Sequence, residues 1–412
     1  MKRGFIGVII LSLLLTCSCT QKAKTADVKQ SDSKVELGIV RHPPAASYSR
    51  GKMTGLPSFN PNSEDNWQVD LRSYDISDLS LADRLKDLKY ADFDSKTVWP
   101  KNLPKEFDKD KIMELGKNPG LGIRELHSKG ITGKGVGVAI IDQQLLVDHT
   151  EYKDRLRYYD EIHIDNGTPA QMHGPAVASI AVGKNVGVAP EADLYYIAET
   201  HGDFKDGGFD WDFTWLAKSI DRILEVNKSL ENDKKIRVIS ISVGWSKEQK
   251  GYKEVTEAVK RAKKEGILVV SSSIHETYKF NFQGLGRDIL NDPESPSSYE
   301  PGIFWKNEYL KKPDLLKTSD YLLIPMDSRT VASPTGEEDY VFYRNGGWSW
   351  SIPYISGLYA LACQVNPDIT PEKFWEAALS TGDIIDYKND NKTYKFGTIV
   401  NPKKLMDKIE KK

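Results

Sequence analysis

The sequence predicts an α/β fold: a doubly wound parallel sheet with helices on both faces, preceded by an N-terminal extension. Short Ile- and Val-rich runs begin near residue 136 and are typical of strands buried on both faces of a sheet. Amphipathic helical stretches separate these runs, and helical crossovers imply parallel pairing. In folds of this kind, active sites lie at the carboxyl ends of the strands.

The elements of the predicted sheet follow one another from about residue 119, and residues 119–412 are taken as the main domain. Strands are expected at 136–141, 194–197, 238–243 and 267–271, and helices at 174–182, 213–230, 252–264 and 353–365. Residues 34–118 form an extension, in which apolar residues between 70 and 90 indicate a short helix or an array of turns. This segment could be a cleaved propeptide, a permanent collar around the main domain, or both in turn.

Residues 1–19 have the pattern of a targeting segment. Two basic residues precede an apolar run over 5–15, which is too short to span a bilayer and fits a signal-peptide core. The following Cys17 and Cys19 resemble the lipidation site of bacterial lipoproteins, where a cysteine after small residues carries palmitate or a similar chain. The resemblance implies an exported protein, anchored by Cys17 or Cys19 to the outer face of the cell membrane or another envelope membrane. A plain signal peptide is the alternative, and residues 20–33 read as a polar tether.

Composition and spacing bear on several other classes of site. With 57 Lys and Arg against 59 Asp and Glu, the chain gives no electrostatic argument for binding nucleic acid. Cys363 lies in an apolar stretch and is expected to be a buried small hydrophobe rather than part of a disulfide framework. His149 and His163 lie near acidic residues, but their spacing matches no metal motif, so surface positions are expected and no metal site is predicted. No pattern indicates an oligomeric state.

Three candidate catalytic residues lie where predicted strands and helices meet. Asp142 directly follows the strand at 136–141, where a carboxylate can reach a cleft or simply begin a turn. His173 opens a helix of small residues, facing either the cleft or the core. Ser349 precedes the helix at 353–365, where backbone N–H groups can stabilise an oxyanion. A plain N-cap is the alternative for Ser349, and Ser351 could equally be that cap.

The order Asp, His, Ser and the local motifs resemble those of the subtilase family of serine proteases. Gly135-Val-Gly-Val-Ala-Ile-Ile-Asp142 is similar to the family's aspartate strand, and His173-Gly-Pro-Ala-Val-Ala-Ser179 to its histidine helix. Gly187-Val-Ala-Pro190 and Gly347-Trp-Ser-Trp-Ser-Ile-Pro353 are similar to the segments that follow the histidine and surround the nucleophile. Gly357 falls where the family has a glycine. The resemblance covers roughly residues 119–412 and implies a subtilisin-like fold.

The resemblance also implies a role for each residue. Ser349 would attack the peptide carbonyl, His173 would take and return its proton, and Asp142 would orient the imidazole. The backbone of Ser242-Val243-Gly244 would pair with an extended polypeptide substrate, and Trp245 would border the specificity pocket. The chemistry requires no cofactor. Family members often bind structural calcium, whose ligands this sequence does not identify.

Two departures from the family pattern concern the site itself. His275 falls at the position of the family's oxyanion-hole Asn, and an imidazole N–H can donate a hydrogen bond there; Asn281 is the alternative donor. Trp348 and Trp350 replace Thr and Met beside the nucleophile and indicate narrowed access, which suits one specific substrate.

Together these features predict a serine endopeptidase that hydrolyses an exported or surface polypeptide through an acyl-enzyme. A catalytically impaired subtilase-fold binding protein is the competing hypothesis. The intact set of Asp142, His173 and Ser349 favours the enzyme, whereas His275 and the altered flanks of Ser349 favour the binding protein. The sequence lacks the Gly-x-Ser-x-Gly elbow of an esterase.

Overall fold

A computed structural model describes residues 35–61, 63, 65, 67–205, 207–313 and 320–410. The predicted signal peptide, Cys17, Cys19 and the whole of the tether lie outside the described residues. The described residues from Val35 onward group as one compact unit, so position 118 does not separate two independently packed parts. Among the described helices, none is long and apolar enough to cross a bilayer.

The central sheet has five parallel strands in the order β4-β5-β3-β8-β9. Its strands are β3 (Gly137–Asp142), β4 (Leu156–Ile162), β5 (Asp193–Glu199), β8 (Ile236–Ile241) and β9 (Leu268–Ser271). The chain fills one side of β3 first and then crosses to the other, so the order reverses at β3. This confirms the predicted doubly wound parallel sheet, and it places the reversal at the strand that ends in Asp142.

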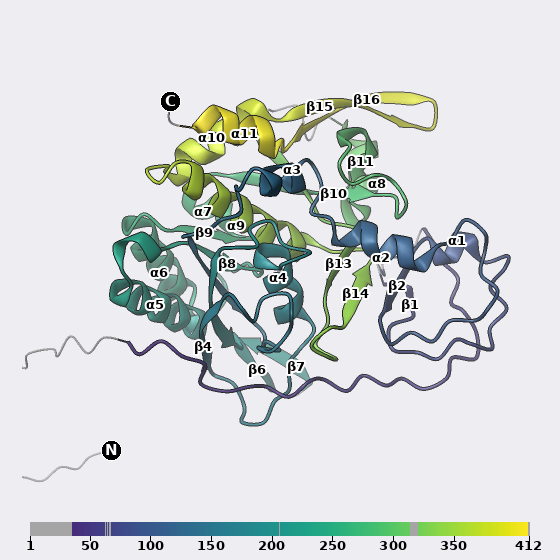
Figure 1. Ribbon diagram of the computed structural model, residues 1–412, viewed down its shortest axis with the longest axis horizontal. Coiled ribbons are helices and arrows are strands. Elements are labelled where there is room, and N and C mark those ends of the chain that lie inside the picture. The colour runs from purple at the N-terminus through teal and green to yellow at the C-terminus, as the bar shows by residue number, and fades with distance from the viewer. Residues whose placement is uncertain are drawn as a thin grey trace, which may run out of the picture. The chain divides into compact units, whose positions relative to one another are not determined.

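Helices cover this sheet in two pairs (Figure 1). α4 (His173–Val182) packs against α9 (Trp348–Val365), and α5 (Thr214–Ser229) packs against α6 (Tyr252–Lys264). A Cβ added at Gly357 would lie 2.7 Å from Cβ of Val188 and 2.9 Å from O of Ala181, so only glycine permits the close approach of α9 to α4.

A second five-stranded sheet, ordered β11-β10-β12-β16-β15, lies toward the C-terminal part of the chain. Its strands are β10 (Asn281–Arg287), β11 (Tyr299–Pro301), β12 (Tyr321–Pro325), β15 (Asp383–Asn389) and β16 (Lys392–Ile399). The accompanying helices are α3 (Ile123–Ser128), α7 (Ile274–Tyr278), α8 (Ile303–Lys311), α10 (Pro371–Thr381) and α11 (Pro402–Ile409). A separate hairpin, β6 (Gly202–Lys205) and β7 (Gly208–Trp211), follows β5.

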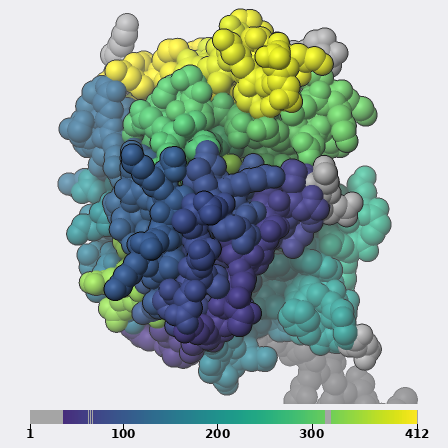
Figure 2. All heavy atoms as spheres, turned by 90° about the vertical axis from the view of Figure 1, so that its right-hand side faces the viewer, coloured from purple at the N-terminus to yellow at the C-terminus, as the bar shows by residue number. Residues whose placement is uncertain are grey.

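The N-terminal extension shares a sheet with the main domain, in the order β1-β2-β14-β13. β1 (Val69–Asp70) and β2 (Ala91–Asp94) come from the extension, and β13 (Arg329–Ala332) and β14 (Tyr340–Tyr343) form a hairpin ahead of α9. Figure 2 shows the extension spread over one face of the molecule, in purple and blue. The predicted helix near 70–90 is limited to α1 (Leu85–Leu88), and α2 (Lys109–Lys117) follows.

A second hydrophobic core joins the extension to the main domain. Eleven buried residues form it, nine of them from the extension and two, Ile289 and Phe342, from the main domain. The nine are Val69, Leu71, Ile76, Leu81, Leu88, Ala91, Phe93, Phe107 and Ile112. Of the buried members between 70 and 90, only Leu88 lies in α1, so an array of turns describes most of this stretch.

Candidate active site

Asp142 and His173 are brought together at the carboxyl edge of the central sheet. Asp142 is the last residue of β3, His173 is the first of α4, and Nδ1 of His173 lies 2.7 Å from Oδ1 of Asp142. Burial disfavours the imidazolium, but the charge of Asp142 and this hydrogen bond outweigh burial, so the pKa of His173 is raised above its ordinary value. The pair is thus a base whose protonated form the neighbouring carboxylate stabilises.

Close packing fixes the position of this pair. A Cβ at Gly174 would lie 2.5 Å from O of Gln143 and 2.6 Å from the hydroxyl oxygen of Tyr196, so a residue other than glycine would displace the start of α4. Gln143 also contributes directly: its backbone N–H donates to Oδ1 of Asp142 at 2.8 Å. This N–H is a second donor to the carboxylate, beside the imidazole of His173.

Ser349 lies in the first turn of α9, which begins at Trp348 and not at Pro353 as predicted. Pro353 lies inside the helix and has no N–H, so the carbonyl of Ser349 loses its normal helical donor. The hydroxyl of Ser242 replaces that donor, at 3.1 Å. Oγ of Ser349 in turn donates a hydrogen bond to the carbonyl of Ser242 at 3.3 Å. Among the described residues, no hydrogen bond joins Oγ of Ser349 to His173.

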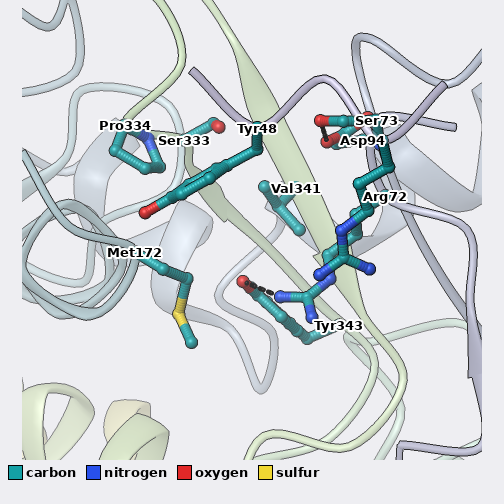
Figure 3. A pocket seen from close by; sticks show the side chains of 10 residues that line it. Tyr48, Arg72, Ser73, Asp94, Met172, Ser333, Pro334, Val341 and Tyr343 are labelled. Atoms are coloured by element: carbon teal, nitrogen blue, oxygen red, sulfur yellow. Dashed lines mark hydrogen bonds between the residues drawn. The ribbon is translucent and has the colours of Figure 1, made fainter. Parts of the chain in front are cut away.

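Aromatic contacts connect His173 to the extension. The ring of Trp350 meets the imidazole of His173 at 5.5 Å between centroids, and Tyr343 meets Trp350 at 5.3 Å with perpendicular planes. Arg72 of the extension donates from Nη1 to the hydroxyl of Tyr343 at 2.9 Å, beside a cavity of about 190 Å³ (Figure 3). Met172, directly before His173, lines the same cavity. Trp350 is buried and packs against the imidazole of His173, and the narrowed access expected from Trp348 and Trp350 stays a prediction.

Two buried carboxylates hold the segment that leads into Ser349. Oδ1 of Asp327 accepts from the backbone N–H of Gly346 at 3.0 Å, and burial raises the pKa of Asp327 to about 6. Oδ1 of Asp92, on β2 of the extension, accepts from the backbone N–H of Arg344 at 2.7 Å, and burial raises its pKa to about 7. The extension therefore contacts the chain just ahead of the candidate nucleophile.

Two cavities lie near the segment that follows β8, where Ser242, Val243 and Gly244 lie. Ser242 and Val243 line the first, and the second is lined by Ser272, whose backbone N–H donates to O of Val243 at 3.1 Å. The triad-side cavity, of about 140 Å³, is lined by Ile141, Asp142, Gln143, His173, Glu199, His201, Leu216, Ile241, Ser242 and Val243. The tryptophan-side cavity, of about 170 Å³, is lined by Ser272, Ile274, His275, Phe280, Asn281, Phe282, Gln283, Tyr321 and Trp348. Both candidate oxyanion donors, His275 and Asn281, thus share a cavity with the residue next to Ser349.

Several predictions from the sequence need revision. Trp245 is buried, and its backbone N–H and carbonyl both bond to Oγ of Ser273, so it packs inside the protein and lines neither cavity. His149 is also buried, with Nε2 2.9 Å from O of Asp339, so its predicted surface position was wrong.

Cys363 is a buried free thiol as predicted, and burial raises its pKa to about 12.

Two acidic residues near the site were missed from the sequence. Glu199 ends β5 and lines the triad-side cavity, and Asp327 follows β12 by two positions. Both have the signal that identified Asp142, an acidic residue at the end of an apolar strand. Among the described residues, no group of three or more His, Cys, Asp or Glu side chains is placed to hold a metal ion.

Comparison with known proteins gives the family. The family model of the "Subtilase family" matches residues 133–300, a span that includes Asp142 and His173. The "Intracellular serine protease" of Paenibacillus polymyxa is 33% identical over 251 residues, which cover 57% of this chain and 68% of that protein. This chain belongs to the subtilase family. The subtilase is thus a serine-type endopeptidase by class, and its mixed α/β fold with a parallel sheet is that of the family.

Other similarities are more distant. The "Major intracellular serine protease" of Bacillus subtilis (strain 168) is 24% identical to the subtilase over 279 residues, covering 61% of this chain and 77% of that protein. Among solved structures, the prenylagaramide maturation protease PagA gives a TM-score of 0.47 at 15% identity, with 70% of this chain and 99% of that chain covered.

Proposed function

We propose that Ser349, His173 and Asp142 form the catalytic triad with which this subtilase hydrolyses peptide bonds. The observation that carries the proposal is the 2.7 Å contact between Nδ1 of His173 and Asp142. If Nδ1 carries the proton and donates to the carboxylate, Nε2 is left as the base. Trp350, which follows Ser349 in α9, contacts the imidazole, and this contact supports the inclusion of Ser349 in the triad.

The proposed reaction begins with a rotation of the Ser349 side chain. Its Oγ leaves the carbonyl of Ser242, a 3.3 Å hydrogen bond, and turns toward Nε2 of His173. His173 takes the hydroxyl proton as Oγ adds to the substrate carbonyl, then gives that proton to the leaving amine. Water releases the acyl group by the same proton transfers in reverse. These steps use groups of this chain alone and need no cofactor.

The oxyanion would be held by backbone and side-chain donors around Ser349. The backbone N–H of Ser349 belongs to the first turn of α9, whose N–H groups have no helical acceptor. The side-chain donor would come from the tryptophan-side cavity, with His275 as the proposed group and Asn281 as its alternative. An extended polypeptide substrate would pair with the backbone of Ser242, Val243 and Gly244, near the two cavities.

The proposal is tested by labelling the protein without residues 1–19 with a fluorophosphonate. Labelling is expected in the wild type and lost in Ser349→Ala, while Ser351→Ala, a neighbouring serine in the same helix, retains it. His173→Ala should also abolish labelling because the base is removed. A folded wild type that resists the reagent would refute the triad and favour the binding-protein alternative. Circular dichroism establishes folding for each variant.

We also propose that the extension stays attached to the mature enzyme as a permanent collar. The pairing of β2 with β14, the joint hydrophobic core and the bond from Arg344 to Asp92 support this. Removing the extension would expose that core and release a buried contact just ahead of Ser349. Retention is checked by the mass of the enzyme isolated from its host, which should include residues 34–118.

Export and lipid anchoring are proposed from the sequence pattern of residues 1–19. The chain would then act on exported or surface polypeptides, attached by Cys17 or Cys19 to a membrane of the bacterial envelope. Metabolic labelling with an alkyne palmitate, comparing Cys17→Ser and Cys19→Ser, tests this. Exactly one substitution should abolish incorporation; labelling absent from the wild type would leave a plain signal peptide as the explanation.

A further inference from the structure

Glu199 is an unusual wall residue of the triad-side cavity. It ends β5, beside β3 in the sheet, where Asp142 pairs in register with Ala198. Its side chain is 1% exposed, and Oε2 lies 3.1 Å from Nδ1 of His201. Among the described residues, its other oxygen, Oε1, is buried and has no hydrogen-bond partner. Half of this carboxyl group is therefore without a donor, at a cost in free energy that a bound group can relieve.

Burial, two histidines and a second carboxylate set the electrostatic environment of Glu199. Burial raises the pKa of Glu199, the hydrogen bond and charge of His201 and the charge of His163 lower it, and nearby Asp142 raises it; the net shift is upward. His201 cannot easily turn away, because its ring stacks on Trp211 at 5.2 Å and on Phe213 at 5.6 Å. An added ammonium or guanidinium would supply both the missing donor and the missing charge.

The remaining walls suit a long side chain that ends in a cation. Ile141, Leu216, Ile241 and Val243 line the same cavity and offer apolar contact for methylene groups. Trp211, which is 39% exposed and stacks on His201, presents an aromatic ring close to this end of the cavity. The volume of about 140 Å³ is small, so one side chain fills it.

We propose that the triad-side cavity binds a lysine or arginine side chain of the substrate, with Glu199 as its counter-ion. The inference rests on the proposed function for the position of the peptide. Successive side chains of an extended strand point to opposite sides. A peptide paired with Ser242–Gly244 therefore places one side chain in the tryptophan-side cavity and the adjacent one in the triad-side cavity. Glu199 thus selects a basic substrate residue next to the substrate residue whose side chain occupies the tryptophan-side cavity.

The binding test uses the Ser349→Ala protein, so it does not depend on hydrolysis. Two fluorescein-labelled hexapeptides of otherwise identical sequence, one with lysine and one with norleucine at the selected position, are titrated by fluorescence polarisation. The lysine peptide should bind at least about tenfold more tightly, and Glu199→Gln in the same background should reduce that ratio to about threefold or less. Glu254→Gln, which alters an exposed carboxyl on α6, should leave the ratio unchanged.

A hydrolysis test on the enzyme with Ser349 intact uses a positional-scanning library of peptide coumarin amides. Lysine and arginine should dominate at one position, and Glu199→Gln should remove that dominance. Equal binding of both hexapeptides, or a preference that survives Glu199→Gln, overturns the inference even if Ser349 is labelled by fluorophosphonate. Conversely, a lysine preference in binding without any Ser349 labelling would retain the inference and refute the proposed protease mechanism. Thermal unfolding of Glu199→Gln confirms that the variant is folded.

Discussion

Phe93→Ala tests whether the extension and the main domain share one core. Phe93 lies on β2, is 2% exposed, and pairs in register with Phe342 of β14. Its ring lies 5.2 Å from Trp99, 6.2 Å from Phe107 and 5.2 Å from Phe342. Truncating a buried Phe costs about 3–5 kcal/mol, and three aromatic partners favour a value of about 4 kcal/mol.

The stability assay is urea unfolding followed by tryptophan fluorescence. With an m-value of about 3 kcal/mol per molar, a loss of about 4 kcal/mol lowers the midpoint by about 1.3 M. Val98→Ala is the matched control, since Val98 belongs to the extension but is 51% exposed. That control should change the free energy of unfolding by less than about 0.5 kcal/mol.

The same variant should also lose activity, because β14 leads toward Ser349. Loosening β2 weakens the bond from the backbone of Arg344 to Asp92. A displacement of about 1 Å at a reacting group can cost about a hundredfold in rate, so fluorophosphonate labelling of Phe93→Ala should slow at least about tenfold. A midpoint equal to that of Val98→Ala would refute the shared core. A large shift in midpoint with an unchanged labelling rate would refute the positioning of Ser349 by the extension.

Three further outcomes are expected. Only neutral His173 can accept the proton of Ser349, and Asp142 raises the pKa of His173, so the labelling rate should fall on acidification with a midpoint above about 6.5. Asp142→Asn should slow labelling and move that midpoint to lower pH. An unmoved midpoint would contradict the pairing of His173 with Asp142. One of the two variants His275→Ala and Asn281→Ala should remove the oxyanion donor and lower turnover about 10²–10³-fold. Equal small losses of turnover would exclude both residues as that donor. Gly357→Ala should lower the free energy of unfolding by about 1–3 kcal/mol, measured in urea, and an unchanged value would show that α9 can shift.

The sequence was most informative where one local feature had one structural outcome. The Ile- and Val-rich runs predicted β3, β5, β8 and β9, because a strand buried on both faces has a nearly continuous apolar run. The ends of helices were harder: α9 begins at Trp348 and continues through Pro353. The carbonyl of Ser349, which Pro353 leaves without its helical donor, accepts from Ser242, more than a hundred residues away in the chain.

In the candidate site too, the sequence indicated the residues that carry a local signal and missed those that depend on distant contacts. The places of Asp142, His173 and Ser349 followed from strand ends, helix starts and motif resemblance. Glu199 has the same local pattern as Asp142, an acid at the end of an apolar strand, yet a strand end alone does not reveal an unpartnered oxygen in a cavity. That depends on what the neighbouring strands and the β6–β7 hairpin leave open.

The sequence by itself determined the family, the parallel sheet and the three candidate catalytic residues, since strand burial and local motifs are written in consecutive residues. Only the tertiary structure decided that the extension adds β1 and β2 to the β13–β14 hairpin, that Asp92 bonds the segment ahead of Ser349, and that Glu199 faces the triad-side cavity. The physical reason is that these contacts join residues far apart in the chain. Their energies depend on burial and on distance in space, and neither is encoded in local spacing.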